Sequence, residues 1–426
     1  MRIILVNKFH YLKGGSETYY FGLAEGLKKV GHEVHFFAMQ DEKNLPCGDA
    51  DLFVSAKDYN GATSAAKKIS EAKSLIYSKE SLEKFESLCE RVHPDIVHMN
   101  LVHRQITLSI IDAPYLKEHH VPVLFTSHDY ILVCPNYLML DGSGNVCDAC
   151  LGGHFKECLK RKCVRGSTAK SALAMMEADW YKRHQTYSKI DRIIAPSEFM
   201  RKKLLEGGFP GKQVVTMQNF VSEELLDCAR KAEDGTDRDN PYFIFFGRLS
   251  KEKGIKTLLD AFKLALPQLP EGMRLVIVGD GPEREELESA ARKSVEFVGF
   301  KQGEGLRKLV SGAAFACCPS EWRENMPYSV VEAFAAGTPV IGTNIGGIPE
   351  LVHDRETGLL CEPCDAASLS AMLRQAMNLF ADKKVYAALQ QCCKEYVLAH
   401  CDQGKYMNAL VELYLELVSE KNGQQA

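Results

Sequence analysis

The chain alternates short apolar runs with segments whose apolar residues recur at helical spacing. In the first such unit, Ile3–Asn7 predicts a buried strand, and the following pattern predicts a helix from Ser16, as its N-cap, to about Val30. Gly31 can take the left-handed conformation that ends a helix, and Glu33–Met39 predicts the next strand. Strands that alternate with helices are typical of βαβ units, so the pattern predicts an α/β fold with parallel sheets.

The same alternation continues along the chain. Long helices are predicted at about 62–91 and 168–188, and an amphipathic helix at about 403–420. Residues 232–241 are polar and rich in helix breakers, which indicates a linker or an exposed loop beside a domain boundary. The further strands are predicted at 95–99, 121–126, 191–195, 214–217, 242–246, 274–278, 295–298, 314–318 and 339–342.

Length and composition narrow the class of protein. The 426 residues exceed the roughly 250–300 at which a single core stops growing, so we expect two domains. A net charge of −4 gives no general attraction to nucleic acid, and we expect no nucleic-acid partner. No apolar run is long enough for a signal peptide or a membrane span, and the chain holds 15 cysteines, so we expect a reducing, cytoplasmic location.

Residues 246–254, Phe-Gly-Arg-Leu-Ser-Lys-Glu-Lys-Gly, join a predicted strand to a predicted helix. Ligands of open α/β sheets bind beyond the carboxyl ends of strands, which is where this loop falls. Arg248 and Lys253 can together hold a diphosphate, one as a planar fork and the other as a compact ammonium. Taken alone, this pair is better interpreted as two solvated surface charges.

A second strand-to-helix turn reads Val278-Gly279-Asp280-Gly281-Pro282. Arg284 stands where a dinucleotide-binding fingerprint needs its third glycine, so this is not that motif. The two glycines would still let the backbone approach a ligand closely. A tight turn with Pro282 in the first helical position explains the same residues equally well.

The segment 319–333 contains the start of another predicted helix, with Pro327 in its first turn. The backbone N–H groups near this start would face an anion or sugar oxygens, aided by the helix dipole. They belong to the positions around Met326, Tyr328 and Ser329.

Two carboxylates flank that helix start, Glu324 before it and Glu332 more than a turn into it. Carboxylates repel phosphate but accept hydrogen bonds from sugar and ribose hydroxyls. Acidic residues near a helix N-terminus also stabilise the helix, which is a structural explanation for part of the pattern. A further predicted strand at 339–342 and the glycine loop at 346–350 end at the same edge.

In their order and spacing, these motifs resemble the family 4 retaining glycosyltransferases of the GT-B fold. The motifs are Arg248 with Lys253, Gly279-x-Gly281-Pro282, Glu324-x7-Glu332 and Gly346-Gly347-Ile348-Pro349-Glu350. The resemblance covers nearly all of residues 1–420 and is densest from 246 to 360. It implies two Rossmann-like domains whose parallel sheets face a cleft. The implied domains are an acceptor-side domain at 1–222 with a cysteine-rich insertion at 134–165, a nucleotide-sugar-binding domain at 223–400, and a helix at 401–426 that returns to the first domain.

The resemblance also implies roles for residues of the second domain. Arg248 and Lys253 would neutralise the diphosphate leaving group, Glu324 would contact the donor sugar, and Glu332 would contact the ribose. Donor-binding backbone would come from glycines and from the segment after Glu324, namely Gly247, Gly281, Met326, Tyr328 and Ser329. The family usually has glycines where Asn325-Met326-Pro327 stand here, and Pro327 removes one N–H from this set.

In the first domain, Gly14-Gly15-Ser16-Glu17 resembles the family's glycine loop, which approaches the donor phosphates. The segment 126–130 resembles the one that brings a histidine, here His128, to the donor sugar. An isolated histidine after a strand is more often structural, and the resemblance reverses that preference for His128.

The implied reaction is transfer of a sugar from a UDP- or GDP-sugar to a glycan or lipid-linked acceptor, with retention of configuration, in surface polysaccharide synthesis. No catalytic metal is expected, because the basic pair neutralises the leaving group. Two other classes remain open: a GT-B-like sugar-nucleotide epimerase, and a non-catalytic sugar-nucleotide-binding subunit. The epimerase would need catalytic carboxylates in the first domain. The binding subunit would be favoured if His128, Arg248, Lys253 or Glu324 were missing, and all four are present.

The insertion carries five cysteines close together. Cys147 and Cys150 have metal-type spacing, and Cys158 and Cys163 would complete a four-cysteine zinc site, with His154 and Cys134 as competing ligands. Free thiols, or a disulfide or redox pair, are the alternatives.

Basic residues crowd the end of the insertion and the segment that follows it. Such a patch can rest on anionic lipid headgroups, which would bring the protein to the inner face of the membrane as a peripheral partner. A solvated surface is the preferred interpretation. The residues are Lys156, Lys160, Arg161, Lys162, Arg165 and Lys170, with Arg201, Lys202 and Lys203 further on.

Overall fold

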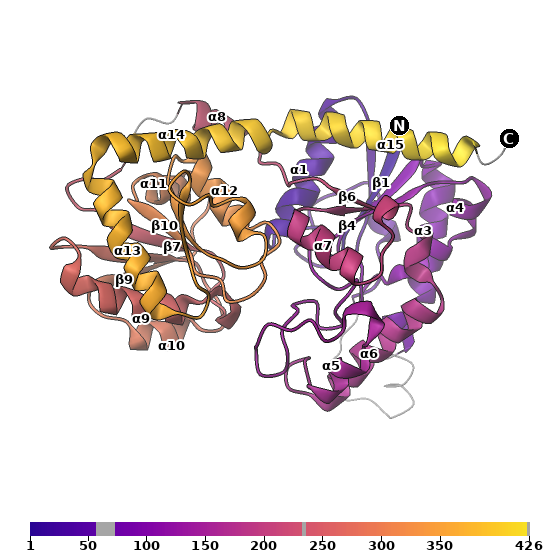
Figure 1. Cartoon of the computed structure of the whole chain (residues 1–426). Helices are drawn as coiled ribbons and strands as arrows, with labels where there is room; N and C mark the ends of the chain where they lie inside the picture. Colours follow the sequence, from indigo (N-terminus) through magenta and orange to yellow (C-terminus); the bar gives the residue numbers. More distant parts are fainter. Residues whose placement is uncertain (57–72, 232–235, 424–426) are drawn as a thin grey trace. The chain divides into compact units, whose positions relative to one another are not determined.

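The computed structural model describes residues 1–56, 73–231 and 236–423 (Figure 1). The chain divides into two compact units. Unit 1 comprises residues 1–217 and 404–426, and unit 2 comprises residues 218–403. Residues 57–72 and 232–235 lie outside the described residues. They include part of the helix predicted at 62–91 and part of the predicted linker. None of the helices in the described ranges is both long and apolar enough to cross a membrane.

Unit 1 is built on a six-stranded parallel sheet with the strand order β2-β1-β3-β4-β5-β6. The chain changes direction across the sheet between β1 and β3, and in doubly wound folds ligands bind at the carboxyl ends of strands at such a point. The strands are β1 Arg2–Val6, β2 Glu33–Phe37, β3 Ile96–Met99, β4 Val123–Thr126, β5 Arg192–Ala195 and β6 Val214–Thr216. Each was predicted from its apolar run.

Helices surround this sheet. The α-helices are α1 Gly15–Lys29, α3 Lys79–Val92, α4 Pro114–Glu118, α5 Lys156–Lys160, α6 Thr168–Arg183, α7 Glu198–Glu206 and α15 Gln403–Gly423. Short 3-10 helices lie at Ala50–Leu52, Leu108–Asp112, Leu151–Gly153, Thr186–Lys189 and Gly211–Gln213.

Helix starts depart in detail from the predicted ones. The prediction of Ser16 as an N-cap is wrong, since α1 begins at Gly15 and Gly14 occupies the N-cap position. The Ser16 hydroxyl instead donates to the Glu17 carboxylate at 3.0 Å. In the predicted 62–91 helix, α3 begins at Lys79 because the Ser78 side chain accepts a hydrogen bond from the Ser81 N–H and caps the first turn.

The C-terminal helix α15 packs on unit 1 through side chains one to two turns apart. The Tyr414 hydroxyl lies 2.6 Å from His98 Nδ1, and the Tyr406 hydroxyl lies 2.6 Å from the Tyr19 hydroxyl. Met407 contacts the backbone at Gly26 so closely that a Cβ there would lie 2.8 Å from its sulfur. The apolar face predicted from helical spacing is therefore an internal packing surface of unit 1.

Unit 2 contains a second six-stranded parallel sheet, with the order β12-β11-β10-β7-β8-β9. Here the direction changes between β7 and β10, which are neighbours in the sheet. The strands are β7 Tyr242–Phe246, β8 Arg274–Val278, β9 Val295–Gly299, β10 Phe315–Cys318, β11 Val340–Thr343 and β12 Gly358–Cys361. The first five were predicted, and β12 was not.

Both faces of this second sheet are covered. In β7, Phe243 and Phe245 pack into one apolar cluster with α9 and α13, and Ile244 and Phe246 pack into another with α12 and α14 (Figure 1). Strands buried on both faces are apolar throughout, which explains their clear sequence signal. The α-helices are α8 Glu223–Lys231, α9 Ile255–Ala265, α10 Arg284–Ala290, α11 Gly303–Ser311, α12 Tyr328–Ala335, α13 Ala366–Ala381 and α14 Lys383–His400, with 3-10 helices at Lys251–Lys253, Leu266–Gln268 and Ile348–Glu350.

Candidate active site

In unit 2, the loop after β7 and the loop after β10 meet at the point where the sheet changes direction. Gly254 ends the first loop with φ +68°, and a Cβ on it would lie 2.0 Å from the carbonyl oxygen of Pro319. Only glycine allows this approach of the two backbones. The approach brings Lys253 and Glu324, one on each loop, to the edge where doubly wound sheets bind ligands.

Lys253 and Glu324 form an ion pair at this edge. Lys253 Nζ lies 2.6 Å from Glu324 Oε1, and the Ser320 hydroxyl donates to the same oxygen at 2.7 Å. Burial lowers the pKa of Lys253, but the Glu324 carboxylate, together with Cys318 and Glu252, raises it above its ordinary value. Lys253 therefore stays charged at every ordinary pH. Its side chain keeps 25% of its surface exposed.

The glycine loop at 346–350 holds the backbone of Glu324. The Gly347 N–H donates to the Glu324 carbonyl at 2.7 Å. Gly346 has φ +63°, and a Cβ on it would lie 2.4 Å from that carbonyl oxygen. In this structure the loop thus positions the catalytic candidate Glu324, through contacts that only residues without a side chain allow.

Arg248 lies in the same loop as Lys253, with 65% of its side chain exposed. Its guanidinium pairs with the Glu252 carboxylate, and its Nε donates to the Ser250 hydroxyl at 3.2 Å. Sequence reasoning missed Glu252. The spacing of four residues between the two opposite charges was the available signal.

The glycine turns after β7 and β8 pack on each other. A Cβ on Gly279 would lie 1.9 Å from the Gly247 carbonyl oxygen, and a Cβ on Gly281 would lie 2.2 Å from the Leu249 carbonyl oxygen. Gly247 itself has φ +151°. The two donor-binding glycines predicted in unit 2, Gly247 and Gly281, therefore have a packing role at this edge.

The helix α12 begins at Tyr328, with Ser329 next and Pro327 as the N-cap residue. Pro327 thus lies one position before the first turn predicted for it. Met326 is buried, and its sulfur accepts a hydrogen bond from the Asn219 N–H at 2.9 Å. Glu332 follows one turn into the helix, and burial alone raises its pKa to about 7.

Unit 1 carries a different polar cluster at the carboxyl ends of β1, β3 and β4. His128 Nε2 lies 2.9 Å from Asn100 Oδ1, and the Tyr19 ring contacts the imidazole edge-on at 4.9 Å. Burial lowers the pKa of His128 to about 3, so the ring is neutral. Sequence reasoning missed Asn100 and Tyr19. The available signal for Asn100 was a polar residue directly after a fully apolar strand.

The start of α1 lies near this cluster in the sequence and in the fold. Asn7, which follows β1, donates to Glu17 Oε1 at 3.3 Å. Glu17 is almost fully buried, and burial raises its pKa. Gly14 is the N-cap and Gly15 the first residue of the helix that carries this carboxylate, and a Cβ on Gly14 would lie 3.7 Å from it.

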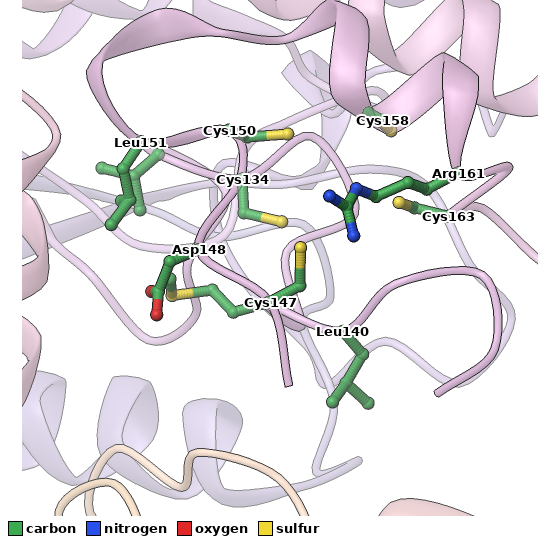
Figure 2. A pocket seen from close by; sticks show the side chains of 11 residues that line it. Cys134, Leu140, Cys147, Asp148, Cys150, Leu151, Cys158, Arg161 and Cys163 are labelled. Carbon is green, nitrogen blue, oxygen red and sulfur yellow. The ribbon is translucent and has the colours of Figure 1, made fainter. Parts of the chain in front are cut away.

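The five cysteines of the insertion line one small cavity of unit 1 (Figure 2). They are the predicted set Cys147, Cys150, Cys158 and Cys163, together with Cys134. All cysteines of the chain are free thiols. Within the described ranges, no three His, Cys, Asp or Glu side chains already lie at distances that fit one metal ion.

Two family models match the chain. One, described as Glycosyltransferase Family 4, matches residues 13–225, and the other, described as Glycosyl transferases group 1, matches residues 229–390.

Three curated proteins illustrate the similarity in sequence. N-acetyl-alpha-D-glucosaminyl L-malate synthase of Bacillus anthracis is 27% identical over 55% of this chain and 62% of its own length. Glycogen synthase of Mycobacterium tuberculosis is 30% identical over 48% of this chain and 50% of its own length. An uncharacterized 42.6 kDa protein of the cps region of Klebsiella pneumoniae is 25% identical over 82% of this chain and 87% of its own length. The chain therefore spans half to two thirds of the first two relatives.

Solved structures show the same fold. Sucrose-phosphate synthase from Thermosynechococcus elongatus superposes with a TM-score of 0.68 at 21% identity, covering 98% of this chain and 99% of that one. The Anabaena protein HepE, in complex with UDP and glucose, superposes with a TM-score of 0.64 at 16% identity, covering 98% of this chain and 100% of that one. Together with the two parallel sheets, these superpositions assign the GT-B fold.

Proposed function

The chain belongs to glycosyltransferase family 4, and from that premise we propose that it transfers a sugar from a nucleoside-diphosphate sugar to a glycan or lipid-linked acceptor, with retention of configuration. The observation that carries the proposal is the Lys253–Glu324 pair at the edge between β7 and β10. An ion pair built by two loops at the ligand-binding edge of a doubly wound sheet combines a cation for a diphosphate with an acceptor for a sugar hydroxyl.

Lys253 has the role of stabilising the leaving group. When the bond between the anomeric carbon and the phosphate oxygen breaks, negative charge grows on the departing nucleoside diphosphate. An ammonium has three donors, so Lys253 can keep Glu324 and still reach a phosphate oxygen. Arg248 is the second cation, and to bind phosphate it exchanges Glu252 for the ligand. With two cations in place, the reaction needs no catalytic metal ion.

Glu324 and Glu332 have the role of binding hydroxyl groups. The second oxygen of Glu324 remains an acceptor for the donor sugar, because Lys253 and Ser320 both contact the first one. Glu332 binds the ribose. The N-terminus of α12, at Met326, Tyr328 and Ser329, supplies backbone N–H groups for sugar and phosphate oxygens.

His128 contacts the donor sugar as a neutral ring, oriented by Asn100. A neutral imidazole that engages a carbonyl oxygen through one nitrogen leaves the other nitrogen as an acceptor for a hydroxyl. The Gly14-Gly15 turn approaches the donor phosphates.

Surface polysaccharide is the proposed product class. The support is the relative from a Klebsiella pneumoniae cps region, which matches over most of both chains. A peripheral position at the cytoplasmic face of the membrane would bring the enzyme to a lipid-linked acceptor. Its support is the exposed basic patch, where Lys156, Lys160 and Lys162 are all exposed.

The test is a melting-temperature screen of the full chain against UDP, GDP, ADP and their sugar conjugates. A ligand at about 100 times its Kd stabilises the folded state by roughly 2.7 kcal/mol, and Lys253→Ala should abolish the shift produced by the best nucleotide. Lys251→Ala is the matched control, because Lys251 is an exposed cation of the same loop.

The sugar donor selected in this way is then incubated with lipid extracts or glycan acceptors, and NMR reads the anomeric configuration of the product. A wild-type protein that responds to none of the nucleotides, or an inverted product, would contradict the proposal.

A further inference from the structure

Five thiols from two stretches of unit 1 line a cavity of about 10 Å³ (Figure 2). Cys134 follows the segment that carries His128, and it packs in the main core of unit 1. The other four come from the loop and short helices of the insertion. A cavity of this size has room for about one water molecule or one metal ion.

The insertion has almost no apolar core of its own. Its cluster of buried residues consists of Cys150, Phe155, Cys158, Cys163 and Ala178, so most of its members are the cysteines themselves. Regular structure between Cys134 and Cys163 is limited to the short helices Leu151–Gly153 and α5. A segment of this kind cannot offset its conformational entropy by apolar burial, and such segments in proteins are held by metal ions or covalent cross-links.

Four of the five thiols surround the cavity as mutual neighbours. Cys150 has Cys134, Cys147 and Cys163 within electrostatic range, and Cys134 in turn has Cys147 and Cys163. In Figure 2 the sulfurs of these four residues point into a common space. Cys158, on α5, is the most deeply buried of the five. It forms a side-chain hydrogen bond with Cys163 and also has Cys150 and Cys134 as electrostatic neighbours, but unlike Cys134 and Cys150 it does not have Cys147 among them.

A positive side chain lines the same cavity. The Arg161 guanidinium lies among the sulfurs in Figure 2 and has Cys147 and Cys163 as electrostatic neighbours. Zinc bound by four thiolates has a formal charge of about −2, and a guanidinium beside the sulfurs offsets part of that charge and can donate hydrogen bonds to them.

We propose that Cys134, Cys147, Cys150 and Cys163 bind one structural Zn²⁺ ion in tetrahedral geometry. This set takes Cys134 in place of the Cys158 predicted from the sequence. The side chains close on the ion by rotation about χ1, since no three of the potential ligands in the described residues already lie at ligating distances. The ion ties the insertion to the segment that follows His128 and so fixes the position of that segment.

The experiment measures bound metal in the full chain, purified under reducing conditions without chelator. We expect about one zinc per chain by elemental analysis, and a lower melting temperature after chelation. Cobalt substitution should give the intense visible bands of a tetrahedral site, with sulfur-to-cobalt charge transfer from four thiolates.

Variants separate the ligands from the bystanders. Cys134→Ala and Cys147→Ala should lose the metal, whereas Cys158→Ala, in the same cavity, and Cys47→Ala, elsewhere in unit 1, should keep it. Cys147→His should restore metal binding with weaker charge transfer, because imidazole is also a zinc ligand. This restoration distinguishes a ligand from a residue needed only for folding.

Lys253→Ala should keep its zinc, so the zinc site and the proposed transferase site can fail independently. A metal-free wild-type protein that melts at the same temperature with and without chelator would overturn the zinc proposal. A disulfide among these cysteines in the reduced preparation would overturn it too, as would metal loss in Cys158→Ala with retention in Cys134→Ala.

Discussion

The two units place polar side chains at equivalent edges of two parallel sheets, but the side chains are charged in one unit and neutral in the other. Unit 2 has a charged pair, Lys253 with Glu324, at the carboxyl ends of β7 and β10. Unit 1 has a neutral pair, His128 with Asn100, at the carboxyl ends of β3 and β4. The same architecture therefore carries an ion pair in one unit and a neutral hydrogen-bonded pair in the other.

This difference in charge comes from the partner that each loop supplies to a partly buried titratable side chain. Burial disfavours the charged form of both Lys253 and His128. In unit 2 the β10–α12 loop supplies Glu324, whose carboxylate more than compensates for the lost solvation. In unit 1 the partner is the uncharged amide of Asn100, so His128 loses its proton. Unit 2 thus holds a charged lysine at its edge, whereas unit 1 holds a neutral histidine.

The largest expected effect comes from removing the charge in unit 2. Lys253→Ala should lower kcat/KM by about a thousandfold, which is roughly the loss on removing one preorganised group that stabilises developing charge. It should also destabilise unit 2, because Glu324 is left buried without its cation. Steady-state kinetics and chemical denaturation measure the two effects, and Lys253→Ala with Glu324→Gln together should regain part of the stability but none of the activity. Near-normal turnover in Lys253→Ala would refute the idea that the charge at the edge of unit 2 drives the reaction.

The neutral pair in unit 1 should contribute less. His128→Ala should lower kcat/KM by about ten- to a hundredfold, since loss of a hydrogen bond that leaves a buried partner unpaired costs roughly 1–3 kcal/mol. His128→Gln is the conservative control, because it keeps a neutral donor for Asn100. The folded-state pKa of His128 is about 3, below the ordinary 6.5. His128 therefore takes up no proton between pH 5 and 8, and it should cause no change in activity over that range. A drop in wild-type rate near pH 6.5 that disappears in His128→Gln would show a charged histidine instead.

Ionisation of Glu332 should change two properties in opposite directions: the stability of the folded state and its affinity for nucleotide. Burial raises its folded-state pKa from 4.5 to about 7, so the folded state holds the proton more tightly than the unfolded chain. Stability from this group should therefore fall as pH rises from 4.5 to 7. If Glu332 binds the ribose as proposed, nucleotide affinity should rise by about tenfold as this carboxylate ionises. Titration calorimetry and melting at several pH values test both trends, and both should be absent in Glu332→Gln. Equal pH profiles for the two proteins would exclude Glu332 as the cause.

The smallest effect is expected at the packing contact between α15 and β3. Tyr414→Phe removes the hydroxyl that contacts His98 Nδ1 and should cost unit 1 about 1 kcal/mol of unfolding free energy. The nucleotide-induced shift in melting temperature should be unchanged, because the contact lies within unit 1, between α15 and β3. A change in nucleotide affinity would mean that this packing contact also influences the donor site.

Secondary structure was predictable where burial is complete. The predicted bounds of β7 and β8 agree with the structure, because strands covered on both faces are apolar without interruption. The strand β12 was missed, since Gly358–Cys361 begins with glycine and has an apolar run of only three residues. Its pairing with β11 explains that glycine, because a Cβ on Gly358 would lie 1.8 Å from the Val340 carbonyl oxygen.

The sequence predicted which residues belong to the site better than it predicted which of them contact one another. Motif spacing identified Lys253 and Glu324 as site residues, but nothing in the sequence paired two residues 71 positions apart. Glu252 and Asn100 each had a local signal in the sequence, but their contacts with Arg248 and His128 were not predicted. They depend on where a loop turns and on which strands become neighbours.

By itself, the sequence determined the α/β alternation, most of the strands and the chemical types at the loop ends, because these follow from local burial patterns and from residue identity. Only the tertiary structure decided which side chains meet. The order β7 next to β10 joins a lysine to a glutamate, and the order β3 next to β4 joins an asparagine to a histidine. Strand order is set by long-range packing of the two sheet faces, and it therefore decides the charge at each edge.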